Sequence, residues 1–151
     1  MLQAFTCTAV PNPILWTGAK PVYVDIESDT LNMSPSDLLK KITPRSKVLI
    51  IQHTFGTPAK LDALLAIAKQ HQLFVIEDCA HALGARYHDQ LLGTFGDAAI
   101  FSFGRDKVIS SVYGGALLTK QPFTMPPLPY PSIFWTKQQL LHPVITALAK
   151  K

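Results

Sequence analysis

Charged residues are scarce in this sequence. Asp, Glu, Lys and Arg make up 16% of its 151 residues, against roughly 25% in typical soluble domains. A domain of this length exposes much of its surface, so a shortage of charge indicates that some of that surface is covered by other polypeptide. The cover would be further parts of the same protein or a second subunit. We therefore expect a large apolar patch on the isolated chain.

Long apolar runs and dense basic clusters are also missing. No run reaches the roughly 18 residues that a membrane-spanning helix needs, so we expect no membrane span. The net charge of +4 is scattered along the chain. Its densest basic group, residues 40–47, is interrupted by Pro44 and contains no aromatic residue. This pattern is typical of a solvated helix end, and we expect no nucleic-acid partner.

The small number of cysteines and the absence of phosphate-binding motifs exclude several further classes of protein. Cys7 and Cys79 form neither a disulfide framework nor a C-x-x-C pair. The histidines show no zinc-ligand spacing, so we expect no metal site. No G-x-G-x-x-G or G-x-x-x-x-G-K-[ST] motif follows any candidate strand, which disfavours dinucleotide and nucleoside-triphosphate sites. Without a visible secretory signal, a cytoplasmic location is the default expectation.

Apolar patterning predicts alternating strands and helices. Short runs rich in β-branched residues predict strands that are buried on both faces. Between them, leucines and alanines at helical spacing predict helices, one of which should begin with Ser34 as its N-cap and Pro35 in its first turn. Strands alternating with helices in this way predict an α/β fold with a mostly parallel sheet. The strands are expected at 21–26, 47–52, 73–77, 98–103 and 115–119, and the helices at 34–43 and 59–71.

The C-terminal part of the sequence differs in composition. Proline is dense in residues 121–131, which predicts an extended linker. Residues 132–151 are expected to form a helical segment, kinked or divided at Pro143, that leads toward a further domain. Residues 1–120 would then form the main domain.

Polar residues follow three of the predicted strands. His53 follows the strand at 47–52, Asp78 follows the strand at 73–77, and residues 102–107 follow the strand at 98–103. Ligands of open parallel sheets bind beyond the carboxyl ends of the strands, so these positions predict a site. Local sequence also fits less specific roles: Asp78 as a helix cap, His81 as a half-buried histidine, and Lys107 as part of a solvated turn.

Several segments, in their order and spacing, resemble the DegT/DnrJ/StrS family of sugar aminotransferases, which use pyridoxal 5′-phosphate (PLP) and have the aspartate-aminotransferase fold. The resemblance runs from about Gln3 to Lys120. Each segment alone is weak, but the set is highly specific. The segments are GAKPVYVDIESDTLNM, VLIIQHTFG, VIEDCAHALGARY, LLGTFGDAAIFSF and, after Lys107, GGALLT.

The resemblance implies a fold, a cofactor and four site residues. The fold would be a three-layer αβα sandwich, of which the chain is the central part of the PLP-binding large domain. Lys107 matches the lysine that forms the Schiff base with PLP, and Asp78 matches the aspartate that pairs with the pyridinium nitrogen. His81 takes the position beside the ring oxygen of the cofactor, and Ser102 matches a serine that contacts its phosphate. PLP acts as an electron sink that protein groups tune.

The resemblance also implies an activity and partners. The enzyme would convert a nucleotide-linked keto-sugar to an amino sugar, with an amino acid such as glutamate as donor, in polysaccharide or amino-sugar biosynthesis. The full-length form would be a homodimer. A PLP-dependent sugar dehydratase is an alternative, although a histidine can replace the lysine in those enzymes and this chain retains Lys107. A further alternative is a non-catalytic truncated remnant or interaction module that keeps the fold.

Two features depart from the family pattern. The family usually has an aromatic residue over the cofactor ring just after the threonine that matches Thr6, and here that position is Cys7. Family members are also more than twice as long as this chain. We therefore expect a fragment that lacks an upstream segment with further phosphate contacts and lacks the smaller C-terminal domain.

Overall fold

The computed structural model describes residues 1–124, 126–127 and 129–149. In chain order its elements are β1 (Leu2–Gln3), α1 (Pro11–Trp16), β2 (Tyr23–Val24), α2 (Pro35–Lys41), β3 (Val48–Gln52), the 3-10 turn η1 (Thr54–Gly56), α3 (Leu61–Gln70), β4 (Phe74–Asp78), β5 (Arg86–Tyr87), β6 (Gln90–Leu91), β7 (Ala98–Ser102), β8 (Gly115–Thr119) and α4 (Ile133–Ala149). The predicted helices and most of the predicted strands are present, whereas β1, α1, η1, β5 and β6 were not predicted.

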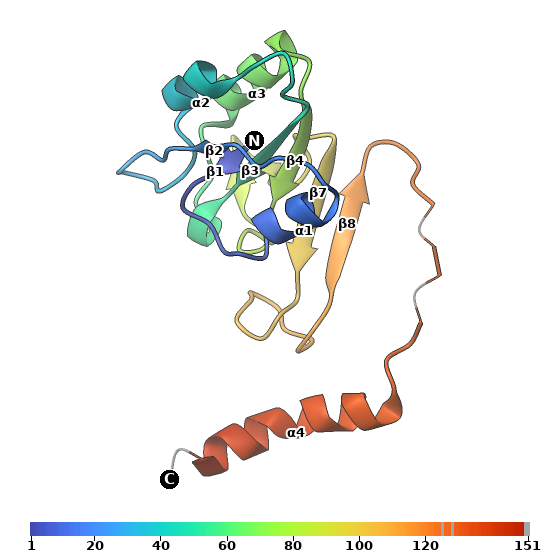
Figure 1. Ribbon diagram of the computed structural model, residues 1–151. Helices are drawn as coiled ribbons and strands as arrows, with labels where there is room; N and C mark the ends of the chain where they lie inside the picture. Colours follow the sequence, from blue (N-terminus) through green and yellow to red (C-terminus); the bar gives the residue numbers. More distant parts are fainter. Residues whose placement is uncertain (125, 128, 150–151) are drawn as a thin grey trace.

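A four-stranded, mostly parallel sheet forms the centre of the structure, in the order β3-β4-β7-β8 (Figure 1). The first three strands are parallel, and the register places Gln52 beside Asp78 and Asp78 beside Ile100. Strand β8 is antiparallel to β7 and pairs Gly115 with Ser102. A parallel partner needs a long crossover, and residues 103–114 return directly without a helix. The predicted mixed α/β fold with a largely parallel sheet is confirmed.

The predicted strand at 21–26 is shorter than expected and has a different partner. Only Tyr23–Val24 is a strand, and it pairs in parallel with β1 in a separate two-stranded sheet. Strand β1 was not predicted, because two residues are too few to show a pattern. The N–H of Ile50 donates to the carbonyl of Met1 at 2.9 Å, so the small sheet lies beside β3. The expectation that strand 21–26 belongs to the main sheet is therefore wrong, because among the described strands β2 pairs only with β1.

Helices lie on both faces of the sheet (Figure 1). Helices α2 and α3 cover one face, where Leu64 is fully buried in a core with Leu49 and Ile51. Alternate residues of β3 and β4, Ile50 and Ile76, point to the opposite face and line a cavity below α1. One face is thus filled by core side chains, and the other is available for a site.

The start of α2 is as predicted, but its cap is not. The helix begins at Pro35. The hydroxyl of Ser34 bonds to the hydroxyl of Ser36 at 3.0 Å and makes no capping bond to the helix backbone. Asp37 in the first turn instead accepts from the N–H of Asp25 at 2.7 Å and pairs with Lys41. Asp37 therefore fixes this helix end to the preceding loop.

The C-terminal part extends away from the sheet (Figure 1). The described residues between Gln121 and Pro131 form neither helix nor strand. The predicted helix follows as a single element, α4, and Pro143 does not divide it; the predicted helical residues 150 and 151 lie outside the described residues. The division into a domain, a linker and a helical segment stays a prediction. Among the described helices, none is both long enough and apolar enough to cross a membrane.

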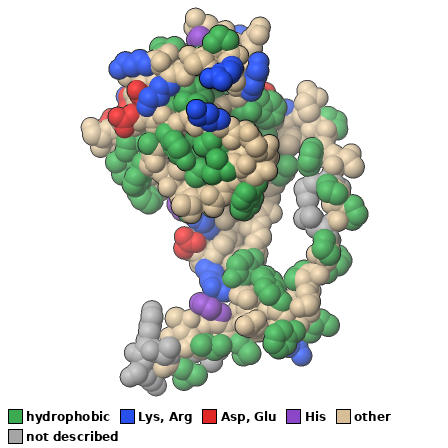
Figure 2. Space-filling view, in the orientation of Figure 1, with side chains coloured by type: hydrophobic (Ala, Val, Ile, Leu, Met, Phe, Trp, Pro, Cys, Tyr) green, Lys and Arg blue, Asp and Glu red, His purple; other side chains and the backbone are tan. Residues whose placement is uncertain are grey.

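The surface carries the surplus apolar area that the low charge predicts. Hydrophobic side chains gather over α1 and along α4 in Figure 2. Trp16 in α1 and Phe134 in α4 are largely exposed. Exposed apolar patches of this kind are typical of interaction surfaces.

Candidate active site

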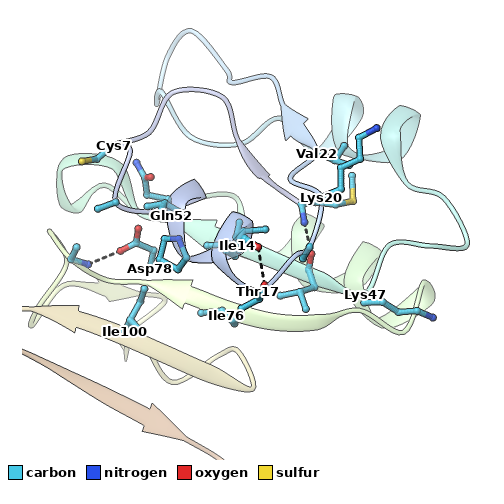
Figure 3. A pocket seen from close by; sticks show the side chains of 18 of the residues that line it. Cys7, Ile14, Thr17, Lys20, Val22, Lys47, Gln52, Ile76, Asp78 and Ile100 are labelled. Atoms are coloured by element: carbon cyan, nitrogen blue, oxygen red, sulfur yellow. Dashed lines mark hydrogen bonds between the residues drawn. The ribbon is translucent and has the colours of Figure 1, made fainter. Parts of the chain in front are cut away.

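A cavity of about 980 Å³ runs along the face of the sheet, from Lys47 before β3 to the carboxyl ends of β3, β4 and β7. Figure 3 shows Cys7, Gln52 and Asp78 at one end of it and Lys20 and Lys47 at the other. All four predicted site residues line this cavity. They are Asp78, His81, Ser102 and Lys107.

Asp78 is the last residue of β4 and is only 5% exposed. Its Oδ1 atom accepts a hydrogen bond from the N–H of Ala80 at 3.0 Å, so the predicted capping role is also present. Within the described part of the chain, no hydrogen bond to Oδ2 is found. Oδ2 is not among the described buried atoms that lack a partner, and Asp78 lines the cavity, so this oxygen is open to accept from a donor on a ligand.

Lys107 lies in the loop after β7, and its side chain turns back toward the cavity. The Nζ atom is 2.8 Å from Nε2 of His81 and 3.5 Å from Oδ2 of Asp106. Only 16% of the lysine side chain is exposed. A solvated turn would leave this amine in water, so the less specific interpretation of Lys107 does not fit the geometry.

Ser102 ends β7, and its hydroxyl begins the turn that carries Lys107. The Oγ atom accepts from the N–H of Gly104 at 3.3 Å, and the N–H of Lys107 donates to the carbonyl of Gly104 at 3.2 Å. These two bonds close a tight turn. The hydroxyl and the amine therefore reach the cavity from the same short loop.

Cys7 lies in the loop after β1, and its side chain is exposed. The neighbouring Thr6 donates its hydroxyl to Oε1 of Gln52 at 2.5 Å. Gln52 in turn lies beside Asp78 in the sheet register. This chain of contacts places the Cys7 loop along the same side of the cavity as Asp78.

His53 was expected at the site edge, but its side chain is a buried structural group. The ring is 0% exposed, and its Nδ1 atom accepts from the N–H of Ala59 at 3.2 Å. The ring proton must therefore be on Nε2, which donates to Oε2 of Glu77 at 3.2 Å. Both ring nitrogens are engaged, so the ring has no capacity left for a ligand.

Glu77 is a buried residue that sequence reasoning missed. Its carboxylate accepts from the backbone N–H groups of Gly93 at 2.9 Å and of Phe95 and Gly96, both at 2.7 Å. Burial alone would raise the pKa of Glu77, but the bonds from His53 and these three N–H groups lower it below its ordinary value. The only sequence signal was an acid inside an otherwise apolar strand.

Cys79 lies beside His53 and Glu77, with ligand atoms within 4.8 Å of one another. Burial, followed by the charges of Glu77 and Asp78, raises the pKa of Cys79 to about 12. The thiol therefore stays protonated, and the other two side chains are already hydrogen-bonded. The hydrogen bonds of His53 and Glu77 make this cluster part of the buried core.

The sequence pattern of the DegT/DnrJ/EryC1/StrS aminotransferase family matches residues 1–125. The chain belongs to this family. Among curated relatives, the chain is 40% identical over 119 residues to GDP-perosamine synthase of Escherichia coli O157:H7. This match covers 79% of this chain and 33% of the relative. It is also 40% identical over 108 residues to dTDP-4-dehydro-2,6-dideoxy-D-glucose 3-dehydratase of Saccharopolyspora spinosa, covering 72% of this chain and 23% of the relative.

Solved structures of similar proteins agree with this DegT/DnrJ/EryC1/StrS assignment. DesI, solved in the presence of its TDP-sugar product, is 35% identical with a TM-score of 0.76, over 80% of this chain and 31% of DesI. The PLP form of Spr1654 from Streptococcus pneumoniae is 30% identical with a TM-score of 0.76, over 80% of this chain and 35% of that protein. The chain thus spans about a quarter to a third of the length of these relatives.

Proposed function

We propose that this chain is the cofactor-binding part of a PLP-dependent sugar aminotransferase. The reaction converts the keto group of a nucleotide-linked sugar to an amine, with an amino acid such as glutamate as donor, in polysaccharide or amino-sugar biosynthesis. The complete enzyme is a cytoplasmic homodimer. One observation carries the proposal: Asp78, His81, Ser102 and Lys107 line a single cavity and follow the carboxyl ends of parallel strands.

The side chains fit the chemical groups of PLP. Asp78 offers a carboxylate oxygen that suits a protonated ring nitrogen. Ser102 offers a hydroxyl beside a tight turn, which suits a phosphate. Lys107 offers a primary amine within the cavity, which suits covalent attachment to an aldehyde. An acid, a hydroxyl and an amine around one cavity match the ring, phosphate and aldehyde of the cofactor.

Each residue has a defined task in the proposed reaction. When bound, PLP supplies an electron sink for negative charge at the α-carbon of the amino donor. Asp78 keeps a proton on the ring nitrogen through a charge-assisted hydrogen bond. Lys107 holds the cofactor in the resting protein and, once released, carries a proton at Nζ to and from the reacting carbon. His81 fixes Nζ at 2.8 Å and so orients the amine.

The position of Cys7 weakens one contact that the family usually makes. An aromatic ring over the cofactor contributes about 0.5–1.5 kcal/mol beyond its buried area. A thiol offers less surface and no ring. We therefore propose that this site holds PLP mainly through Asp78, Ser102 and Lys107.

Dehydration of the same class of sugar is the second candidate. It is favoured by the similarity to a relative named as a sugar 3-dehydratase. Lys107 favours amino transfer, because the primary amine is the group that both holds the cofactor and moves the proton. A fold that has lost its activity would give neither product.

Borohydride trapping tests the proposal directly. The chain is mixed with PLP, reduced with borohydride, digested and examined by mass spectrometry. We expect the cofactor mass on the peptide that contains Lys107, and no label there in Lys107→Ala. Labelling spread evenly over Lys120 and other surface lysines would contradict the proposal. Product analysis with a keto-sugar and glutamate then separates an amino sugar from a deoxy sugar.

A further inference from the structure

Phe55 has a backbone conformation that burial does not explain. It lies in η1, between β3 and α3, with φ of 54° and ψ of 25°. A bulky residue rarely adopts this left-handed region, and the strain has to be offset by other contacts. The side chain is nevertheless 70% exposed. Burial of the ring therefore does not offset the backbone strain, which leaves the contacts of the ring with its neighbours.

The contact is with the ring of His81. The two rings are stacked, with centroids 6.0 Å apart and planes inclined by 25°. The ring of Phe5 packs edge-to-face against the ring of Phe55, with centroids 6.3 Å apart and planes inclined by 71°. Offset stacks and edge-to-face pairs at these separations are favourable. The Phe55 ring is therefore held between the β1 loop and the turn that carries His81.

The backbone of the same turn lies directly against His81. A Cβ atom at Gly56 would be 2.9 Å from the carbonyl oxygen of His81, and Gly56 has a φ of +83°. The N–H of His53 donates to the carbonyl of Asp78 at 3.2 Å, which ties the start of the turn to the end of β4. These contacts fix the position of the Phe55 ring relative to the imidazole.

Stacking restricts the plane of the imidazole, and that plane determines where Nε2 points. Nε2 of His81 is 2.8 Å from Nζ of Lys107. We propose that Phe55 is a positioning residue, which holds the His81 ring so that Nε2 accepts the hydrogen bond of Lys107 and keeps the amine in the cavity. The value of this for catalysis rests on the proposed function, but the coupling between Phe55 and Lys107 does not.

A purely structural role would give a different result. If Phe55 only stabilised its turn, its replacement would lower stability and leave the His81–Lys107 contact unchanged. If Phe55 only formed the rim of the cavity, its replacement would change ligand affinity without changing the protein alone. The test therefore measures the His81–Lys107 hydrogen bond in the protein without cofactor.

The ¹⁵N resonance of His81 Nε2 in the full chain reports that hydrogen bond. The change in this resonance on Lys107→Met is measured with Phe55 intact and again in Phe55→Leu. Comparing the two changes removes the direct effect of the Phe55 ring on the shift. Phe55→Tyr retains an aromatic ring and serves as the conservative variant. Phe123→Leu, which replaces another exposed phenylalanine, is the control, and thermal melting checks that each variant is folded.

We expect Lys107→Met to shift Nε2 in the wild-type, Phe55→Tyr and Phe123→Leu proteins, and to shift it by less than a third as much in Phe55→Leu. An equal shift in Phe55→Leu would overturn the proposal. If Phe55→Leu does not fold, Phe55→Met takes its place under the same criterion. Absence of PLP labelling at Lys107 would contradict the proposed function alone, because the resonance is measured without PLP.

Discussion

The amine of Lys107 lies 2.8 Å from Nε2 of His81, although the two residues are 26 positions apart in the sequence. One comes from the loop after β7 and the other from the turn after β4. Adjacent parallel strands end at the same edge of the sheet, which is why these two loops meet. An ammonium that donates to an imidazole is also held away from bulk water, with 16% of the lysine side chain exposed.

Replacement of Lys107 should abolish amino transfer. In Lys107→Ala the amine that holds the cofactor and moves the proton is gone, so we expect a loss of at least about 100-fold in turnover. Lys107→Arg should fail as well, because a guanidinium stays protonated and cannot attack an aldehyde. The assay uses the E. coli GDP-perosamine synthase in which this chain replaces the matched segment. Near-normal turnover of either variant would contradict the role of Lys107; Lys120→Ala is the matched control.

Asp78→Asn should weaken the retention of PLP. The amide keeps the shape of the side chain but removes the charge that favours a protonated ring nitrogen. A hydrogen bond to a charged group contributes about 1.5–3 kcal/mol, which corresponds to about 10–150-fold in affinity. Titration of PLP followed by its visible absorbance measures this. Unchanged affinity would mean that Asp78 serves only as the cap of the Ala80 turn.

Cys7→Phe should strengthen PLP binding. The substitution restores a ring at the position where the family usually has an aromatic residue. Stacking contributes about 0.5–1.5 kcal/mol, so we expect an affinity gain of about 2–10-fold. Cys7→Ser is the matched control, since it changes the thiol without adding a ring. Weaker binding in Cys7→Phe would show that the cavity has no room above the cofactor ring.

Glu77→Gln should destabilise the fold by at least about 1.5–3 kcal/mol, the range for losing a hydrogen bond to a charged group. The amide group would direct N–H donors at backbone N–H groups that now donate to the carboxylate. Chemical denaturation measures the free energy of unfolding. The exposed Asp62→Asn is the control and should change it by less than about 1 kcal/mol.

The same residue predicts a pH dependence of stability. The folded-state pKa of Glu77 is lowered, so the unfolded state binds the proton more readily. The stabilisation by Glu77 is therefore complete above the unfolded pKa of about 4.3 and is lost as the pH falls through the lower folded value. The stability difference between wild type and Glu77→Gln should shrink from pH 7 toward pH 3. A constant difference would show that Glu77 does not titrate on unfolding.

Gly56→Ala should cost more stability than Gly18→Ala. Both glycines have a positive φ, so each substitution carries the backbone strain of the left-handed region, about 1 kcal/mol or more. Only at Gly56 would the new Cβ meet a backbone atom, the carbonyl oxygen of His81 at 2.9 Å; nothing lies within 4 Å at Gly18. The difference in melting temperature between the two variants reports the steric cost at Gly56, because the backbone strain is common to both. Equal losses would mean that the His81 turn moves aside without cost.

Local patterns in the sequence determined the elements and the edge at which the site lies. Continuous apolar runs predicted β3, β4 and β7 as strands buried on both faces. The strands are present, but in this chain their second face is only partly buried, because it lines the cavity. Asp78 and Lys107 were expected at one edge because they follow such strands. Their chemical roles came from the resemblance to the family, since nothing local distinguishes a cofactor lysine from a surface lysine.

Contacts between distant segments decided the rest. The direction of β8, the partner of β2 and the burial of His53 against Glu77 depend on residues far apart in the sequence. The same holds for the Phe55–His81 stack, which joins two turns at the ends of neighbouring strands. A sequence pattern records which side chains favour burial along one element. Which group each of them meets is fixed only when the strands pair, because pairing sets the register that brings their ends together.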